Sequence, residues 1–279
     1  MTVAPADDLT AAAESAADAP PERSLWERNE NLVLGLVSVT AFLLFWEFSV
    51  LFGFVNPLFT SSPGRIFATG FEMFRDGSIY PDLWVSAQEF ALGYGLAVII
   101  GVPLGILMGW YSRLNALLDP FVSALYATPR IALMPLIIIW FGIDMSAKIA
   151  IIFLSTVFPI VISTMTGVRT MERDYVKVAR SFGASDRQLF TTVALPSSVP
   201  HILTGLRLGL GHALIGIVVG EMYGASAGIG YMMQTAGATF QTDKVMVGIL
   251  IIAGAGMGFT QVLKMIEARF DAWRPDHHL

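Results

Sequence analysis

The chain has 279 residues, of which 54% are hydrophobic and only 14% are charged, and its formal net charge is −5. A soluble domain usually carries about 25% charged residues, so this chain lacks the polar side chains that a water-exposed surface requires. The absence of cysteine excludes disulfides, thiolate chemistry and cysteine metal sites. The composition therefore predicts an integral membrane protein.

The first predicted element is an acidic tail over residues 1–30. It is rich in Ala, Asp, Glu and Pro and has almost no large apolar residues. Such a segment cannot bury enough surface to fold alone, so we expect a disordered cytoplasmic tail. It has neither the basic start nor the apolar centre of a signal peptide. Because most of the net charge comes from this tail, that charge says little about a partner.

Six later segments are predicted to cross the membrane, because each offers the run of about 20 mostly apolar residues that a spanning helix needs. The third and fifth are interrupted by Pro or Gly and carry charges. The predicted fold is an all-α integral membrane domain over residues 31–279 with six transmembrane helices. Their ranges are about 32–53, 84–110, 119–142, 147–168, 201–223 and 245–266.

Six spans place both ends of the chain on one side of the membrane. With the N-terminus inside, twelve Lys and Arg residues lie on the inner side and four on the outer side, with Arg130 left within a span. The positive-inside rule therefore predicts that both termini and the polar segment 169–200 are cytoplasmic. In the outer loop 54–82, an amphipathic run predicts a short interfacial helix at about 63–75.

Glycines recur at four-residue intervals inside the predicted spans. Small residues at this spacing lie on one helix face and let another backbone approach closely. The pattern fits packing within one subunit and packing between subunits equally well. The three stripes are Gly101, Gly105 and Gly109; Gly216, Gly220 and Gly224; and Gly254 and Gly258.

The segment 169–200 reads RTMERDYVKVARSFGASDRQLFTTVALPSSVP and separates two apolar runs. Tyr175, Val178 and Phe182 have the spacing of one helix face. Gly183 is suited to the left-handed position that follows a helix end. The first half of the segment is therefore predicted to be a short helix that ends at this glycine.

A second short helix is predicted to start at Asp186, because Ser185 and Gln188 have the spacing of a capping box. Leu189 and its neighbours give it an apolar face, and Pro196 is expected to end it. The apolar faces of both helices are expected to pack on the membrane domain. The turn between them would then project outward and could dock into a groove of another protein. An ordinary solvated loop is the alternative that these residues leave open.

The segment resembles the EAA loop of permease subunits of bacterial ATP-binding-cassette importers. That motif reads Glu-Ala-Ala, three residues, Gly, nine residues and Ile-x-Leu-Pro. Here Ala179 matches the last alanine, Gly183 follows at the right spacing, and Val-Ala-Leu-Pro closes the motif at 193–196. Lys177 replaces the glutamate and Val178 the first alanine. These departures put the usual glutamate contact with the ATPase in doubt, but not the turn.

The resemblance extends over nearly the whole chain, from PFVSALYATPRIALMPLIIIWFGI to the closing EARFDAWRP. These stretches look like the branch of nitrate, sulfonate, taurine and bicarbonate permeases, which has some pyrimidine- or vitamin-precursor relatives. The resemblance assigns ATPase coupling to Lys177, Ala179, Gly183, Ala184, Ser185, Asp186, Arg187, Leu195 and Pro196.

The resemblance implies a type I importer with a MetI-like permease fold in the bacterial inner membrane. Two copies of the chain, or one copy and a paralogue, would enclose a pathway for a small anionic solute. Two separate ATPase subunits would bind ATP and Mg, and an extracytoplasmic binding protein would deliver the solute. The chain itself would be no enzyme and would bind no cofactor, metal or nucleic acid. It contains no G-x-x-x-x-G-K-[ST] phosphate loop, as expected if the ATPase is separate.

Three residues within the spans are candidates for the translocation pathway. Arg130 lies between Pro129 and Pro135, where a broken helix could expose a cation to an anionic solute. The alternative is that the span starts near Arg130 and its guanidinium reaches the cytoplasmic interface. Met134 follows in the same segment. Glu221, near the outer end of the fifth span, could line the pathway or pair with a neighbouring helix.

Two other classes of protein fit the residues less well. A secondary transporter or channel predicts repeated halves and ion-carrying carboxylates at the midplane. The sequence shows no convincing repeat, and this class leaves the glycine turn unexplained. A membrane enzyme would need a cluster of metal ligands or a nucleophile with its base. No such constellation is evident in the sequence.

Overall fold

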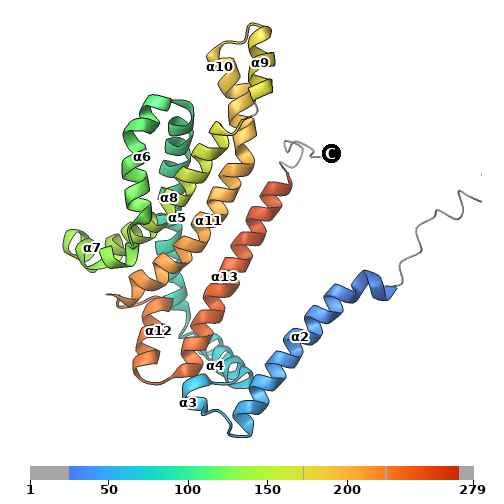
Figure 1. Cartoon of the computed structure of the whole chain (residues 1–279). Coiled ribbons are helices and arrows are strands. Elements are labelled where there is room, and N and C mark those ends of the chain that lie inside the picture. The colour runs from blue at the N-terminus through green and yellow to red at the C-terminus, as the bar shows by residue number, and fades with distance from the viewer. Residues whose placement is uncertain (1–24, 172, 224, 270–279) are drawn as a thin grey trace, which may run out of the picture. The chain divides into compact units, whose positions relative to one another are not determined.

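The computed structural model describes residues 25–171, 173–223 and 225–269, and every regular element within these ranges is a helix (Figure 1). The predicted all-α fold class is therefore confirmed. The elements are α2 (Leu25–Leu51), α3 (Pro57–Thr60), α4 (Pro63–Arg75), α5 (Tyr80–Trp110), α6 (Ser112–Ala127), η1 (Arg130–Leu133), α7 (Met134–Phe141), α8 (Met145–Arg169), α9 (Arg173–Ser181), α10 (Asp186–Leu189), η2 (Phe190–Ala194), α11 (Leu195–Met222), α12 (Ile229–Ala238) and α13 (Thr242–Ala268).

The chain forms two compact units, residues 1–55 and 56–279. In the first unit, α2 is a long apolar helix, and none of the side chains in its most apolar stretch is buried. The helix already begins at Leu25, within the predicted tail 1–30. Residues 1–24, the rest of that tail, lie outside the described residues.

Within the described residues, five helices are long and apolar enough to cross a membrane. They contain almost all of five predicted spans: α2, α5, α8, the continuous helix Asp186–Met222, and α13. The remaining predicted span, 119–142, covers α6, η1 and α7, which bend by 92° at Thr128 and Pro129 and count as a sixth span only if taken together. Proline lacks a donor and fixes its φ angle, so a break at this point is expected.

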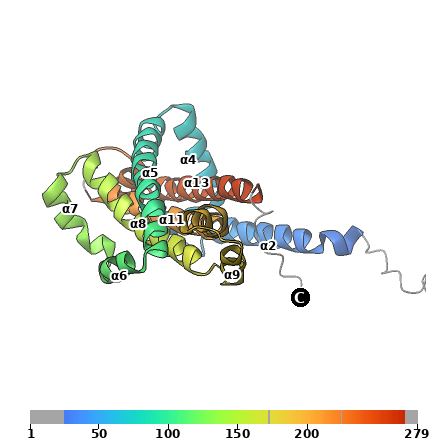
Figure 2. The same ribbon diagram turned by 90° about the horizontal axis from the view of Figure 1, so that it is seen from above.

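The core of the second unit is centred on α8, which packs between α5 and α11 (Figure 2). Glycines allow this close approach. A Cβ atom placed on Gly109 of α5 would lie 2.6 Å from Val168 Cβ, and one on Gly220 of α11 would lie 2.9 Å from Ile151 Cγ2. The stripe on α5 and the described members of the stripe on α11, Gly216 and Gly220, therefore serve packing within the chain, whereas Gly224 lies outside the described residues. By contrast, a Cβ atom on Gly254 or Gly258 of α13 would meet nothing within 4 Å.

Helix α4 occupies the segment 63–75 that was predicted to be a short helix. Ser62 caps its N-terminus by accepting a hydrogen bond from the Arg65 N–H, and Pro63 takes the first turn, where its missing donor costs nothing. Arg65 Nη2 forms an ion pair with Asp243 Oδ2 at 2.8 Å. This pair joins α4 to the start of α13.

Candidate functional site

The turn after α9 has the geometry of a Schellman motif. Gly183 takes the left-handed conformation with φ of 79°. Its N–H donates to the Arg180 carbonyl at 2.9 Å, and the Ala184 N–H donates to the Ala179 carbonyl at 3.0 Å. These two bonds satisfy carbonyls that a helix end leaves without partners. The prediction that Gly183 ends the first helix is confirmed.

The start of α10 is a capping box, as the sequence predicts. The Gln188 N–H donates to Ser185 Oγ at 3.3 Å, and the Ser185 N–H donates to Gln188 Oε1 at 2.9 Å. Arg180 Nη2 also contacts Asp186 Oδ1 at 2.9 Å, which links the two sides of the turn. We call residues 173–195 the α9–α10 hairpin. Its turn is fixed mainly by hydrogen bonds between neighbouring residues.

The expected helix end at Pro196 is wrong. The chain continues from α10 through the π-helical turn η2 into α11, as one helix from Asp186 to Met222. The Leu195 N–H donates to the Phe190 carbonyl, five residues back, which widens the helix just before Pro196. A π-helical turn is a known way to accommodate a break in the regular bonding ladder. The hairpin turn thus continues directly into a long helix of the core.

The expected packing of both apolar faces is only half right. On α10, Leu189 is buried, and the ring of Phe190, the next residue and the first of η2, meets Trp110 at the end of α5 with 5.0 Å between centroids. On α9, Val178 is 55% exposed, and Phe182, just after the end of this helix, is 87% exposed. The face of α9 therefore does not pack on the core of its own chain and remains open to a partner.

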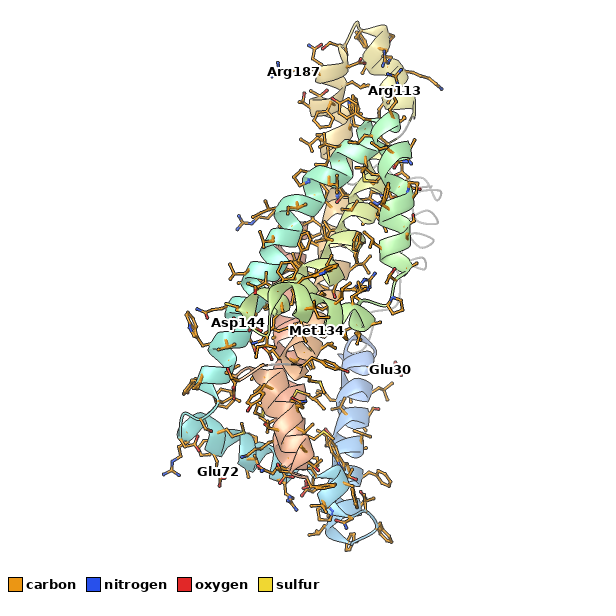
Figure 3. All side chains as sticks on the ribbon, turned by 90° about the vertical axis from the view of Figure 1, so that its left-hand side faces the viewer. Glu30, Glu72, Arg113, Met134, Asp144 and Arg187 are labelled. Carbon is orange, nitrogen blue, oxygen red and sulfur yellow. The ribbon has the colours of Figure 1, made fainter. Side chains whose placement is uncertain are left out.

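Eight of the nine residues assigned to ATPase coupling lie in this hairpin (Figure 1), and Pro196 directly follows it in α11. Figure 3 shows Arg187 at the hairpin tip. Five of the nine residues are exposed, and the other four are half-buried. Exposed are Lys177, Gly183, Ser185, Asp186 and Arg187; half-buried are Ala179, Ala184, Leu195 and Pro196.

The pathway candidates Arg130 and Met134 lie at the bend between α6 and α7. Arg130 Nη2 donates to the Tyr126 carbonyl at 2.8 Å, and its guanidinium lies 5.0 Å from the Tyr126 ring centroid. The cation therefore sits against the C-terminal end of α6, where the helix dipole favours positive charge. Met134, labelled in Figure 3, is only 2% exposed and packs in the core with Ile137.

Glu221, the third candidate, is fully buried at the opposite end of α11. Its carboxylate accepts hydrogen bonds from the Ser86 hydroxyl and the Gly230 N–H. Ser86 in turn accepts from the Ile229 N–H at 2.9 Å. The first N–H groups of a helix have no partner within the helix. Glu221 and Ser86 supply those partners and fix the start of α12.

A buried ion pair adjoins this contact. Lys148 Nζ of α8 lies 2.9 Å from Glu89 Oε1 of α5, with side-chain exposures of 8% and 1%. Glu89 lies one turn from Ser86 on α5, and the backbone of Lys148 lies beside Gly220, the residue before Glu221. We call Ser86, Glu89, Lys148 and Glu221 the buried polar cluster. Its members join α5, α8, α11 and α12 through fixed polar contacts.

Sequence reasoning missed three of these four residues. Only Glu221 was among the candidates predicted from the sequence. One signal was present: Asp82, Ser86 and Glu89 occur at intervals that place polar groups on one face of a membrane helix. Asp82 indeed also contacts α12, by accepting a bond from the Gly228 N–H at 2.8 Å.

Known proteins resemble this chain in sequence over most of its length. The taurine transport system permease protein TauC of Escherichia coli strain K12 is 32% identical, over 89% of this chain and 92% of the relative. The putative aliphatic sulfonates transport permease protein SsuC of Bacillus subtilis strain 168 is 35% identical, over 86% and 87% of the two chains.

A solved structure resembles the chain in fold. It is an inward-facing form of the MetNI methionine ABC transporter, with a TM-score of 0.53 and 18% identity, covering 66% of this chain and 95% of the other. Residues 101–272 match a protein family described as "binding-protein-dependent transport system inner membrane component". Together with the identity to TauC over most of both sequences, this match shows that the chain belongs to that family of ATP-binding-cassette permeases.

Proposed function

We propose that the chain is the permease subunit of an ATP-binding-cassette importer for a small anionic solute of the sulfonate class. The family match, the MetNI-like fold and the taurine and sulfonate relatives support this function. A second permease copy or a paralogue, two ATPase subunits and an extracytoplasmic binding protein complete the machine. The assembly lies in the bacterial inner membrane with both termini of the chain in the cytoplasm.

The observation that carries the proposal is the α9–α10 hairpin. Its turn is exposed, its backbone is fixed by the Schellman motif and the capping box, and it continues without interruption into α11. A movement of a partner at the turn is therefore transmitted to a helix that packs on the core. The exposed rings and aliphatic groups of α9 give that partner an apolar surface to cover.

In this account the ATPase subunit binds the turn, and closure of the two ATPases around ATP and Mg moves both hairpins. The core helices follow, and the pathway changes from inward-facing to outward-facing. The chemistry of ATP hydrolysis belongs to the ATPase, and the permease contributes the mechanical link. Arg130, Met134 and Glu221 stay candidates for the pathway. In the single chain Met134 and Glu221 are buried, so any contact with solute requires another conformation.

Reconstitution tests the proposal. The chain is placed in proteoliposomes with its ATPase and binding protein, and ATP hydrolysis and uptake are measured with taurine, an alkanesulfonate, nitrate and a pyrimidine precursor. We expect a sulfonate to stimulate hydrolysis and to accumulate only when ATP is present. If the pyrimidine precursor alone stimulated ATP hydrolysis, the proposed solute class would be wrong, but the proposal of an ATP-driven importer would stand. Uptake without any ATPase would contradict the proposal of an ATP-driven importer and would favour a secondary transporter.

A further inference from the structure

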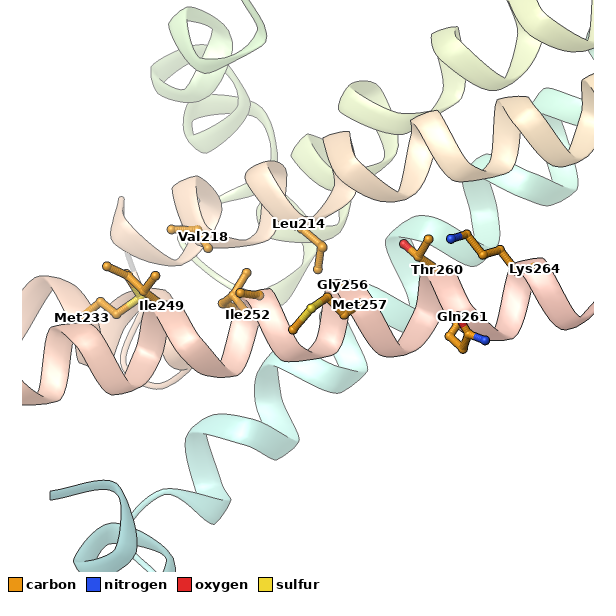
Figure 4. A pocket seen from close by; sticks show the side chains of 11 residues that line it. Leu214, Val218, Met233, Ile249, Ile252, Gly256, Met257, Thr260, Gln261 and Lys264 are labelled. Atoms are coloured by element: carbon orange, nitrogen blue, oxygen red, sulfur yellow. The ribbon is translucent and has the colours of Figure 1, made fainter. Parts of the chain in front are cut away.

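A groove runs along one side of α13, between this helix, α11 and α12 (Figure 4). Its volume is about 740 Å³. Leu214 and Val218 of α11 and Met233 of α12 form its walls, and the floor follows α13 from Ile249 to Lys264. The groove shares no residue with the α9–α10 hairpin or with the buried polar cluster.

The polarity of the groove changes along its length. Near α12 its lining is aliphatic and methionine side chains, whereas Thr260, Gln261 and Lys264 gather at the other end (Figure 4). Lys264 is exposed, and across residues 25–171, 173–223 and 225–269 we find no hydrogen bond or ion pair that it makes. Glu267, one turn further along α13, is engaged with Arg207 instead. The groove is thus mostly apolar, and the exposed ammonium group of Lys264 lies at its polar end.

The length of α13 separates Lys264 from the other end of the helix by about the thickness of a bilayer core. Lys264 follows Thr242, the first residue of α13, by about 22 residues, or about 33 Å of helix, and the hydrocarbon core of a bilayer is about 30 Å thick. The Lys and Arg bias of the loops predicts that this end of α13 is cytoplasmic. Basic pockets between membrane helices on that side bind the headgroups of anionic lipids.

We propose that this groove binds one anionic phospholipid of the inner leaflet, with an acyl chain along α13 and the headgroup phosphate at Lys264. A free anionic solute would match Lys264 but leave the apolar length uncovered. A helix from a second copy would cover the apolar length but would also need an acid at the depth of Lys264. A phospholipid supplies both parts.

Lipid titration of the purified full chain tests this inference. In detergent, the apparent affinity for phosphatidylglycerol and for phosphatidylcholine is measured by native mass spectrometry and by the shift in thermal unfolding midpoint. We expect tighter binding of phosphatidylglycerol, because the choline cation of phosphatidylcholine offsets the charge of its phosphate. Lys264→Gln should weaken phosphatidylglycerol by about fivefold and phosphatidylcholine by less, so that the preference for the anionic lipid is largely lost. Arg113→Gln, which removes an exposed cation outside the groove, should leave both affinities unchanged.

A second variant tests the apolar part of the site. Ala253→Trp places a bulky ring in the groove from an exposed position, so it should weaken both lipids. Equal affinities of the native chain for the two lipids would overturn the proposal, and so would an unchanged preference for phosphatidylglycerol in Lys264→Gln. Efficient disulfide-linked dimers of Ala253→Cys in native membranes would show that a second copy fills the groove instead.

Discussion

The two ends of the helix that includes α11 are built in opposite ways. At Asp186 the helix begins in an exposed turn, and most of its polar contacts are between close neighbours in sequence. At Glu221 it ends fully buried, in contact with Ser86 of α5 and Gly230 in the first turn of α12. The first end leaves its surface available to a partner, whereas the second is already satisfied inside the chain. A helix that transmits a partner's movement needs both properties: an exposed contact surface at one end and fixed contacts with the core at the other.

The largest effect on stimulated ATP hydrolysis is expected from a change that distorts the exposed turn at Gly183. Gly183→Val places a β-branched residue at φ of 79°, a conformation that such residues avoid. Nothing lies within 4 Å of the added Cβ atom, so the change should distort the turn with little effect on core packing. We expect at least a tenfold loss of solute-stimulated ATP hydrolysis in the reconstituted complex.

Gly53→Val is the matched control for that change. Gly53 has φ of 75° and equally open surroundings, but it lies outside the hairpin. The same strain there should leave stimulated hydrolysis close to its native level. Equal losses in both variants would show that backbone strain in general, and not the hairpin turn, causes the defect.

Changes in the buried polar cluster, at the Glu221 end of the helix, should lower the free energy of unfolding. Lys148→Met leaves Glu89 as an unpaired charge in the core, and breaking a buried ion pair in this way costs about 3–5 kcal/mol in the free energy of unfolding. Denaturant unfolding in detergent measures this loss. The double variant Glu89→Leu and Lys148→Met should recover most of it, because no charge is then left alone. A single variant as stable as the native chain would contradict the assigned pair.

The smallest effect is expected at Lys177, the residue that departs from the family pattern. It is exposed on α9, and exposed charge pairs are worth about 0–1 kcal/mol. Lys177→Glu should therefore change stimulated hydrolysis by about twofold, in a direction set by the facing charge of the ATPase. Reversal of that charge should undo the change. A tenfold effect would mean that Lys177 lies at the centre of the contact.

Local signals in the sequence predicted the hairpin well. Gly183 and the Ser185–Gln188 pair act through bonds between residues a few positions apart, so their spacing is sufficient to place the turn. The helix at 63–75 was predicted from its amphipathic run, and the cap by Ser62 fixes its start. Apolar length similarly predicted most of the long helices.

Features that depend on distant parts of the chain were harder to predict. Whether Phe182 packs on the core depends on where α5 and α8 end, and the spacing within α9 carries no such information. Pro196 did not end its helix because η2 accommodates it. The pairing of Glu89 with Lys148 joins residues 59 positions apart, and only the fold brings them together.

Site-directed cross-linking tests the central claim most directly. Because the chain has no cysteine, Arg187→Cys carries a single thiol at the hairpin tip, and Glu72→Cys carries one on α4 at the predicted outer side. In the assembled complex, a short bifunctional reagent should join Arg187→Cys to the ATPase subunit, with a yield that changes when ATP is added. Glu72→Cys should give no such product. Absence of the ATPase adduct at Arg187, with normal assembly and transport, would contradict the account of the hairpin as the coupling element.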